Sequence, residues 1–176
     1  MLLISNTPAK ENLSTAKDTS GVIKKMLNNS LFMSDKDDWE TPKKLYESLD
    51  NEFHFNLDPC CSKETAKCSS FYTIEDDGLS KEWKGNVFMN PPYGRQIINW
   101  IKKAKEESDK GAVVVCLVPA RTDTKWWHTY CMKSAEIRLL TKRLTFEGAN
   151  NKATFPAAIV IFKPEKNEPI LKAQIV

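Results

Sequence analysis

Residues 112–118 read Ala-Val-Val-Val-Cys-Leu-Val, an apolar run that follows Gly111 and ends at Pro119. An unbroken apolar run of this length is typical of a buried parallel strand that is covered on both faces. Before it, residues 97–104 repeat apolar side chains at helical intervals, and residues 86–89 form another apolar run. A strand, a helix and a second strand in this order predict an α/β domain with a mostly parallel sheet.

The rest of the chain extends this pattern. A helix is expected to begin after Thr41-Pro42, because threonine can cap a helix and proline fits its first turn. The other expected elements are strands over residues 53–57 and 71–74, a helix over 125–131, and strands over 137–140 and 157–162. The segment between Asp58 and Asn90 is short, so one strand-helix unit is expected to be reduced. We predict a Rossmann-like domain of reduced size with helices flanking the sheet.

This domain is expected to span residues 36–165. Residues 1–35 are polar and irregular, which predicts a flexible N-terminal tail with at most one short helix. Residues 166–176 are expected to form a C-terminal tail. A chain of 176 residues is long enough for one domain with a true hydrophobic core.

The composition is that of an ordinary globular protein, with 41% apolar and 28% charged residues. The formal net charge of +3 tolerates a polyanionic partner but does not require one, so nucleic acid must be argued from the site. No apolar segment approaches the length needed to cross a bilayer, and the start of the chain lacks the features of a secretory signal. We therefore expect a cytoplasmic protein without a membrane partner.

The chain contains five cysteines, Cys60, Cys61, Cys68, Cys116 and Cys131. An odd number without a secretory signal indicates free thiols in a reducing compartment. The first three cysteines and His54 suggest an alternative, a zinc-binding module. Their spacing is not that of paired C-x-x-C motifs, and adjacent cysteines seldom both reach one tetrahedral ion. We therefore expect no bound metal.

Residues 90–93 read Asn-Pro-Pro-Tyr and directly follow an apolar run. The side-chain oxygen of Asn90 and a backbone carbonyl of the Asn-Pro turn could accept both protons of an exocyclic amine. Pro91 and Pro92 restrict the backbone before substrate arrives, and Tyr93 offers a ring for stacking. The tetrapeptide therefore predicts a site for a flat, amino-bearing base. The alternative is an ordinary strand-to-turn proline pair with a packed tyrosine.

Two aspartates are expected near this tetrapeptide. Asp58 and Asp77, like Asn90, lie at or near the ends of predicted strands. Ligands of parallel α/β sheets bind at the carboxyl ends of the strands. The three residues are therefore expected to converge on one site.

Taken in order, these segments resemble the amino-methyltransferases that use S-adenosylmethionine, and more closely the phage-type (Dam-like) DNA N6-adenine methyltransferases. The resemblance covers about residues 39–162. The matching segments are Trp39-Glu40-Thr41-Pro42, Leu57-Asp58-Pro59-Cys60, Asp77-Gly78-Leu79 with Trp83, Asn90-Pro91-Pro92-Tyr93-Gly94, Val118-Pro119-Ala120-Arg121-Thr122-Asp123 and Arg143-Leu144-Thr145-Phe146. The Asn-Pro-Pro-Tyr element alone also occurs in methyltransferases that act on RNA or on protein glutamine, and these remain alternatives.

The resemblance implies methyl transfer from S-adenosylmethionine to the N6 amine of adenine in DNA, with the base flipped out of the duplex. Asn90, Pro91, Pro92 and Tyr93 would form the catalytic element that binds the adenine. Acceptors on both amine protons free the nitrogen lone pair and stabilise the positive charge that develops. The donor-binding residues that the resemblance implies are Trp39, Thr41, Pro42, Asp58, Pro59, Cys60, Asp77 and Leu79, with Asp58 facing the donor's ammonium group.

Cations and aromatic rings in loops after strands predict a DNA-facing set. Its members are Arg121, Asp123, Trp126, Trp127, Lys142 and Arg143. The alternative is a solvated basic face with structural tryptophans. One departure from the family also matters, because residues 61–65 contain no glycine where a glycine-rich loop is usual. This departure leaves a non-catalytic nucleic-acid-binding remnant as a further alternative.

Overall fold

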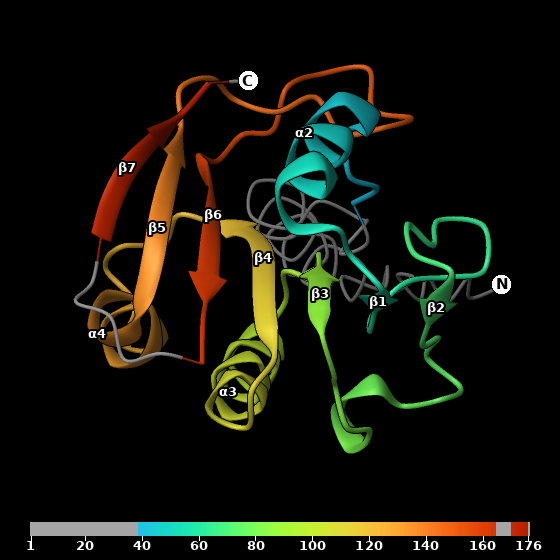
Figure 1. Ribbon diagram of the computed structural model, residues 1–176. Coiled ribbons are helices and arrows are strands. Elements are labelled where there is room, and N and C mark those ends of the chain that lie inside the picture. The colour runs from blue at the N-terminus through green and yellow to red at the C-terminus, as the bar shows by residue number, and fades with distance from the viewer. Residues whose placement is uncertain (1–38, 165–169, 176) are drawn as a thin grey trace, which may run out of the picture. The chain divides into compact units, whose positions relative to one another are not determined.

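The computed structural model describes residues 39–164 and 170–175, and these build a seven-stranded sheet (Figure 1). The strand order is β2-β1-β3-β4-β6-β5-β7. The strands are β1 (Leu57–Asp58), β2 (Ser70–Phe71), β3 (Asn86–Met89), β4 (Val113–Pro119), β5 (Ala135–Leu140), β6 (Ala157–Phe162) and β7 (Ile170–Gln174). Only β6 runs antiparallel to its neighbours β4 and β5, so the predicted mostly parallel α/β sheet is confirmed.

The centre of the sheet is its most apolar part. Every residue of β6 is buried, and all residues of β4 after Val113 are buried as well. The two strands pair over six residues, from Val114 opposite Phe162 to Pro119 opposite Ala157. Strands this apolar must be covered on both faces, which fixes them in the middle of the sheet.

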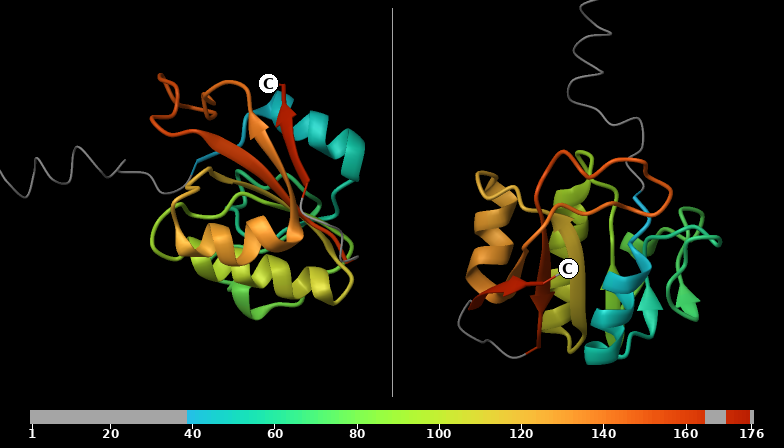
Figure 2. Two further views of the ribbon diagram at one scale, coloured as in Figure 1. Left: turned by 90° about the vertical axis from the view of Figure 1, so that its left-hand side faces the viewer. Right: turned by 90° about the horizontal axis from the view of Figure 1, so that it is seen from above.

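Helices lie on both sides of the sheet (Figure 2). The helix α2 (Lys43–Phe53) covers one face, and α3 (Ile97–Asp109) and the short α4 (Met132–Ser134) lie on the other. The helix α2 buries Leu45 and Leu49, and its Tyr46 ring meets Phe88 of β3 edge to face at 5.1 Å. This packing places the first turn of α2 beside the sheet edge where β3 ends.

Two strands differ from their predicted bounds. The strand predicted over residues 53–57 begins later, and the strand predicted over residues 71–74 ends earlier. The helix α2 continues to Phe53, and His54 ends it in a left-handed conformation with its N–H bonded to the Asp50 carbonyl (2.7 Å). Asp50 also accepts the Phe55 N–H with its carboxylate (2.8 Å), so of the predicted strand 53–57 only Leu57 belongs to β1. After β2, the carboxylate of Asp76 accepts the N–H and hydroxyl of Thr73 (both 2.9 Å) and starts a turn.

The C-terminal prediction also needs correction. Residues 166–176 were expected to form a tail, but Ile170–Gln174 form β7, which pairs in parallel with β5. This edge strand carries mostly exposed side chains, so its sequence lacks the apolar alternation of a half-buried strand. The predicted tail over residues 1–35 lies outside the described residues.

The predicted reduction occurs around β2. Among the described residues, neither the connection from β1 to β2 nor that from β2 to β3 contains an α-helix. The second connection contains only the 3₁₀ turn η1 (Gly78–Ser80). Trp83 fills part of the space, because its indole N–H donates to the Gly78 carbonyl (2.9 Å) and its backbone N–H to the Glu107 carboxylate on α3 (3.1 Å). Lysines 103 and 110 bind the same carboxylate, both at 2.8 Å.

Candidate active site

The site lies where the sheet changes its direction of winding. The chain passes from β1 outward to β2, then returns to the other side of β1 to form β3 and continues to β4. Such a switch point opens a crevice at the carboxyl ends of the two strands that flank it, here at Asp58 of β1 and Asn90 after β3. The topology thus brings these two predicted site residues to one edge of the sheet.

Both the nitrogen and the oxygen of the Asn90 side-chain amide have hydrogen-bond partners. Its Nδ2 donates to the backbone carbonyl of Trp39 and to the hydroxyl of Thr41 (3.1 Å). Its Oδ1 accepts a hydrogen bond from the Tyr93 hydroxyl (2.8 Å). Asn90 itself is half-buried, whereas Thr41 is only 2% exposed. The Trp39-Thr41 segment, predicted to face the donor, therefore contacts the Asn-Pro-Pro-Tyr tetrapeptide directly.

Tyr93 is placed differently from the sequence-based expectation. Its ring is 5% exposed and meets the rings of Phe146 (6.2 Å) and Phe155 (5.6 Å) edge to face. Its hydroxyl also lies 3.3 Å from the Leu117 carbonyl. In this conformation the ring faces are covered, and the polar end of Tyr93 is the part that contacts Asn90. Stacking of a base on Tyr93 stays a prediction that requires Phe146 or Phe155 to move.

Asp58 is a buried carboxylate without an ion-pair partner among residues 39–164 and 170–175. It is 4% exposed and accepts the backbone N–H groups of Cys60 (3.4 Å) and Lys67 (3.3 Å). The ammonium of Lys67 instead pairs with Glu40 at 2.9 Å, and no described cationic side chain lies within ion-pairing distance of Asp58. Burial raises the pKa of Asp58 to about 6, although the two N–H groups act to lower it.

The Cys60 thiol lies near both Asp58 and Asn90. Burial raises the pKa of its thiol well above the ordinary value, and the neighbouring charge of Asp58 raises it further. The backbone N–H of Asn90 acts on the same thiol in the opposite direction. The sulfur is therefore adjacent both to the β1 carboxylate and to the start of Asn-Pro-Pro-Tyr, and it is held protonated and unreactive.

Gly78 explains how the chain after β2 approaches this loop. A Cβ atom at Gly78 would lie 2.0 Å from the Pro59 carbonyl oxygen, so only glycine permits the contact. The contact brings the half-buried Leu79 and the exposed Asp77, which has a left-handed φ of 51°, next to the β1 loop. Gly78 thus has a packing role against the loop after β1 that the sequence patterns did not predict.

A second missed feature is the connection between β5 and β6, residues 141–156, which runs over the carboxyl edge towards the start of α2 (Figure 1). Phe146 packs on Trp39 with ring centroids 5.0 Å apart. Glu147 donates its N–H to the Glu40 carbonyl (3.0 Å), and its carboxylate caps the Lys43 N–H (2.9 Å). No local sequence pattern predicts the contacts of Phe146 and Glu147, because their partners lie about a hundred residues earlier in the chain.

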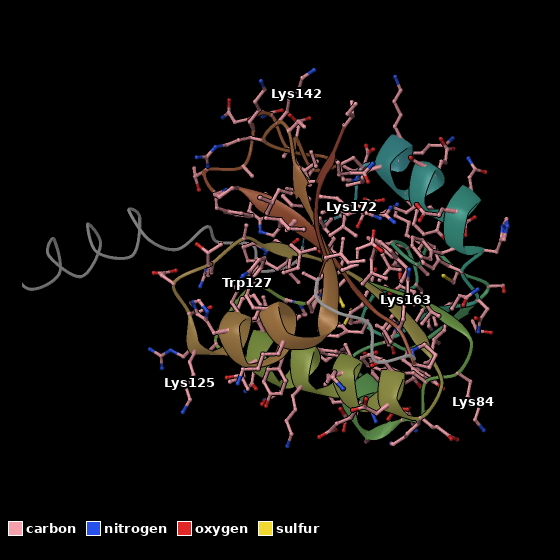
Figure 3. The ribbon with its side chains drawn as sticks, turned by 60° about the vertical axis from the view of Figure 1, so that its left-hand side comes forward. Lys84, Lys125, Trp127, Lys142, Lys163 and Lys172 are labelled. Atoms are coloured by element: carbon pink, nitrogen blue, oxygen red, sulfur yellow. The ribbon has the colours of Figure 1, made fainter. Side chains whose placement is uncertain are left out.

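The predicted DNA-facing set divides into exposed charges and buried rings. Arg121, Asp123, Lys142 and Arg143 are exposed in loops that follow β4 and β5. Trp126 and Trp127 were expected beside them, but they are 7% and 2% exposed and pack on each other at 5.6 Å. Trp127, labelled in Figure 3, is the first residue of the π-helical turn η2 (Trp127–Cys131), and Trp126 directly precedes this turn. They belong to the hydrophobic core in this structure.

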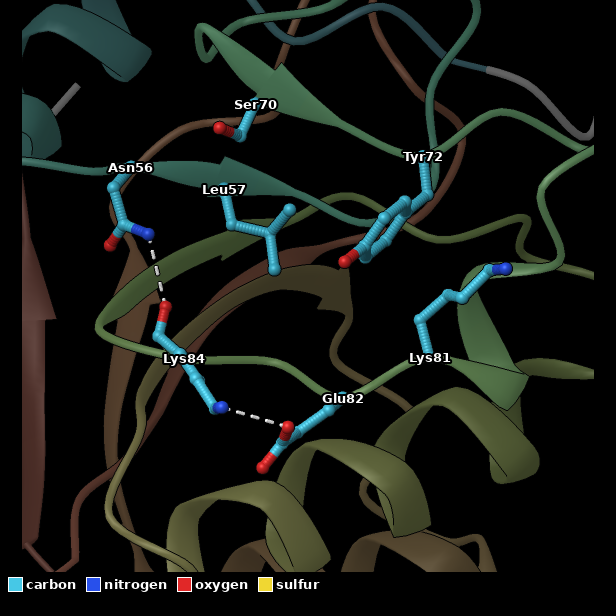
Figure 4. A pocket seen from close by; sticks show the side chains of 7 residues that line it. All are labelled: Asn56, Leu57, Ser70, Tyr72, Lys81, Glu82 and Lys84. Carbon is cyan, nitrogen blue, oxygen red and sulfur yellow. Dashed lines mark hydrogen bonds and ion pairs between the residues drawn. The ribbon is translucent and has the colours of Figure 1, made fainter.

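A separate cavity of about 340 Å³ lies beneath β1 and β2 (Figure 4). It is lined by Asn56, Tyr72 and Lys84, among others, and Asn56 Nδ2 donates to the Lys84 carbonyl (3.0 Å). None of the predicted site residues lines it. It is therefore distinct from the site at the switch point.

Two further observations concern metals and membranes. Within residues 39–164 and 170–175, no group of three or more His, Cys, Asp or Glu side chains is arranged to hold a metal ion. No helix in the described part of the chain is long and apolar enough to span a membrane.

The sheet order, the single antiparallel strand and the site at the switch point define the fold of S-adenosylmethionine-dependent methyltransferases. A protein from Listeria monocytogenes, described as a class I methyltransferase of this kind, shares the fold with a TM-score of 0.52. The match covers 92% of this chain and 74% of that protein, and at 14% identity it shows the fold alone.

The chain belongs to the DNA N-6-adenine-methyltransferase (Dam) family, whose sequence pattern matches residues 28–173. A protein of that name from Escherichia phage T1 is 32% identical over 134 residues. That match covers 74% of this chain but only 55% of the phage T1 protein. A second, from Haemophilus phage HP1, is 28% identical over 163 residues and covers 86% of this chain and 92% of its own length.

Proposed function

We propose that this protein transfers a methyl group from S-adenosylmethionine to the N6 amine of adenine in DNA. The observation that carries the proposal is the placement of Asn90 and the buried Asp58 at one switch point, in a chain of the Dam family. The names of the two phage relatives describe this same activity.

The base side of the reaction depends on acceptors that are fixed before substrate binds. Asn90 follows β3, and Pro91 and Pro92 restrict the turn after it. In our proposal the Asn90 oxygen and a carbonyl of this turn accept the two protons of the adenine amine. This holds the nitrogen lone pair towards the methyl carbon and stabilises the developing positive charge.

The donor side depends on Asp58. A buried carboxylate with a raised pKa and no ion-pair partner in the described part of the chain is a costly arrangement by itself. The ammonium group of an amino-acid moiety would supply the missing charge, which fits the methionine end of S-adenosylmethionine. Pro59 and Cys60 of the same loop, and Thr41 and Pro42 near Asn90, would border this end. The donor supplies an electrophilic methyl group, so the protein needs no strong base before attack.

The adenine must leave the duplex, since an N6 amine in a base pair cannot reach a half-buried Asn90. Exposed Arg121, Lys142 and Arg143 lie in loops at this edge and are suited to phosphate contacts, with Asp123 nearby in the β4 loop. Because the two relatives described above are phage proteins and the proposed substrate is DNA, we expect the reaction in the cytoplasm of an infected cell.

The test is transfer of tritium from labelled S-adenosylmethionine into DNA, with the product nucleoside identified after digestion. We expect N6-methyladenine with the native chain, no turnover with Asn90→Ala, and full turnover with Asn99→Ala, an exposed α3 residue used as the control. Unchanged turnover in Asn90→Ala would refute the role of Asn90. Transfer to RNA or to protein glutamine instead would favour those alternatives.

Calorimetry distinguishes an active methyltransferase from a non-catalytic nucleic-acid-binding remnant. The proposal requires measurable binding of S-adenosylmethionine, alone or with DNA present. DNA binding without any donor affinity would support the remnant instead.

A further inference from the structure

We propose that Thr41 is a positioning residue that, together with the Trp39 carbonyl, sets the orientation of the Asn90 amide. The proposal rests on the proposed methyl transfer, because it assigns a new role within the same site. Thr41 would act through Asn90 and not by contact with the reacting atoms.

The two ends of the Asn90 amide face different partners. The oxygen and nitrogen of an asparagine side chain differ little in shape, so their order follows from the surrounding hydrogen bonds. The Trp39 backbone carbonyl can only accept, so the atom that faces it must be Nδ2. The Asn90 oxygen is then directed to the side of Tyr93, where an incoming amine could reach it.

The second step concerns Thr41. Its hydroxyl oxygen accepts the second Nδ2 bond at 3.1 Å, so the Asn90 NH₂ group has two acceptors. Two donated bonds polarise the amide and increase the negative charge on its oxygen, because hydrogen bonds in a chain reinforce one another. The oxygen that must accept an amine proton is thereby made a better acceptor, and its second lone pair stays available beside the Tyr93 bond.

The third step concerns the rigidity of the segment that carries Thr41. Its side chain is buried, and the next residue, Pro42, is the N-cap of α2, and the Pro42 carbonyl accepts the N–H groups of Leu45 and Tyr46 (both 3.0 Å). Glu147 holds the segment from both sides through Glu40 and Lys43. Thr41 therefore presents its hydroxyl from a fixed position, as a positioning residue must.

The variants Thr41→Val and Thr41→Ser separate the hydroxyl from the shape of the side chain. Valine keeps the volume and removes the acceptor, whereas serine keeps the acceptor. We expect Thr41→Val to lower kcat roughly tenfold, at the upper end for one neutral hydrogen bond. KM for DNA and the Kd for S-adenosylmethionine should stay within about twofold of the native values, and Thr41→Ser should recover most of kcat.

The control is Ser108→Ala, which removes another buried hydroxyl, one bonded to the Lys105 carbonyl (2.8 Å) at the far end of α3. Comparable shifts in thermal midpoint with kcat lost only in Thr41→Val would support positioning. A native kcat in Thr41→Val overturns the proposal. So does a loss confined to donor affinity, or a Thr41→Ser variant as slow as Thr41→Val.

A second readout does not need activity. The two side-chain N–H signals of Asn90, identified in a ¹H–¹⁵N spectrum by their absence from Asn90→Ala, should exchange slowly in the native chain. At least one should shift and exchange faster in Thr41→Val but not in Thr41→Ser. Unaltered Asn90 signals in Thr41→Val contradict the proposal. A native chain that methylates no adenine would instead refute the proposed function, while these signals still test the hydrogen bonds.

Discussion

The Tyr93 hydroxyl donates a 2.8 Å hydrogen bond to the side-chain oxygen of Asn90, three residues earlier in the same turn. The polar end of Tyr93 thus contacts the Asn90 amide, while its ring packs against Phe146 and Phe155. This relationship separates two roles that one aromatic residue can have in a base-binding turn, hydrogen bonding and stacking.

Tyr93→Phe tests which role matters. The substitution keeps the ring and its packing but removes the hydroxyl, so we expect kcat to fall about three- to tenfold, since the Asn90 oxygen loses one fixed contact. Tyr93→Ala should instead lower the free energy of unfolding by about 3–5 kcal/mol, because it leaves a cavity in the core. Turnover and chemical denaturation measure the two effects. A fully active Tyr93→Phe would favour stacking as the main role.

Asp58 makes donor binding depend on pH. Its pKa of about 6 lies above the ordinary value of 3.8, so the folded protein favours the protonated form; this contribution to stability is lost as the pH rises from the ordinary pKa to about 6 and does not change further above it. A donor ammonium requires the ionised form. We expect a constant Kd for S-adenosylmethionine above about pH 7 and a roughly tenfold weaker one at pH 5, where about a tenth of Asp58 is ionised.

Asp58→Asn supplies the control for this pH dependence. The variant should bind the donor weakly and without the change between pH 5 and 7, and without donor it should unfold at a higher temperature than the native chain at pH 8. Calorimetry and thermal unfolding report both. A native chain with pH-independent affinity, or an unaltered affinity in Asp58→Asn, would show that the carboxylate does not face the ammonium.

Trp127 should behave as a core residue. Its side chain is 2% exposed, so Trp127→Ala is expected to lower the free energy of unfolding by about 3–5 kcal/mol. DNA affinity, measured where the variant is folded, should match that of the native chain. Lys125→Ala, an exposed change in the same segment, should leave stability nearly unaltered. A stable Trp127→Ala with weakened DNA binding would instead return the tryptophan to the DNA-facing set.

The exposed cations of the β5–β6 connection should contact phosphate. We expect the double variant Lys142→Gln, Arg143→Gln to bind DNA more weakly and to reduce the slope of log affinity against log salt by roughly two. Fluorescence anisotropy at several salt concentrations measures both. Lys102→Gln on α3 is the control, and an equal loss there would indicate a diffuse charge effect in place of a defined contact.

Much of the fold is readable from local patterns. The strands β3 and β6 occupy residues 86–89 and 157–162 as predicted, since each is an apolar run with a glycine or proline at one or both sides. The convergence of Asp58 and Asn90 also follows from strand order alone. Such features depend on periodicity and punctuation, which a single sequence displays directly.

Other features depend on contacts between distant segments. Glu147 caps α2, and Gly78 packs closely against the Pro59 carbonyl. In neither case does the local sequence pattern predict the contact partner. The burial of Trp126 and Trp127, beside and within the π-helical turn η2, likewise depends on how this segment packs on the rest of the core. The edge strand β7 is recognised only by its pairing with β5.

The central claim is most directly tested by sequencing modified adenines in a plasmid isolated from cells that express the chain. Host methyltransferases should be absent, and cells expressing Asn90→Ala provide the background. We predict N6-methyladenine at plasmid adenines with the native chain and none above background with the variant. Plasmid adenines that stay unmodified, although the protein is folded and binds S-adenosylmethionine, would contradict the account.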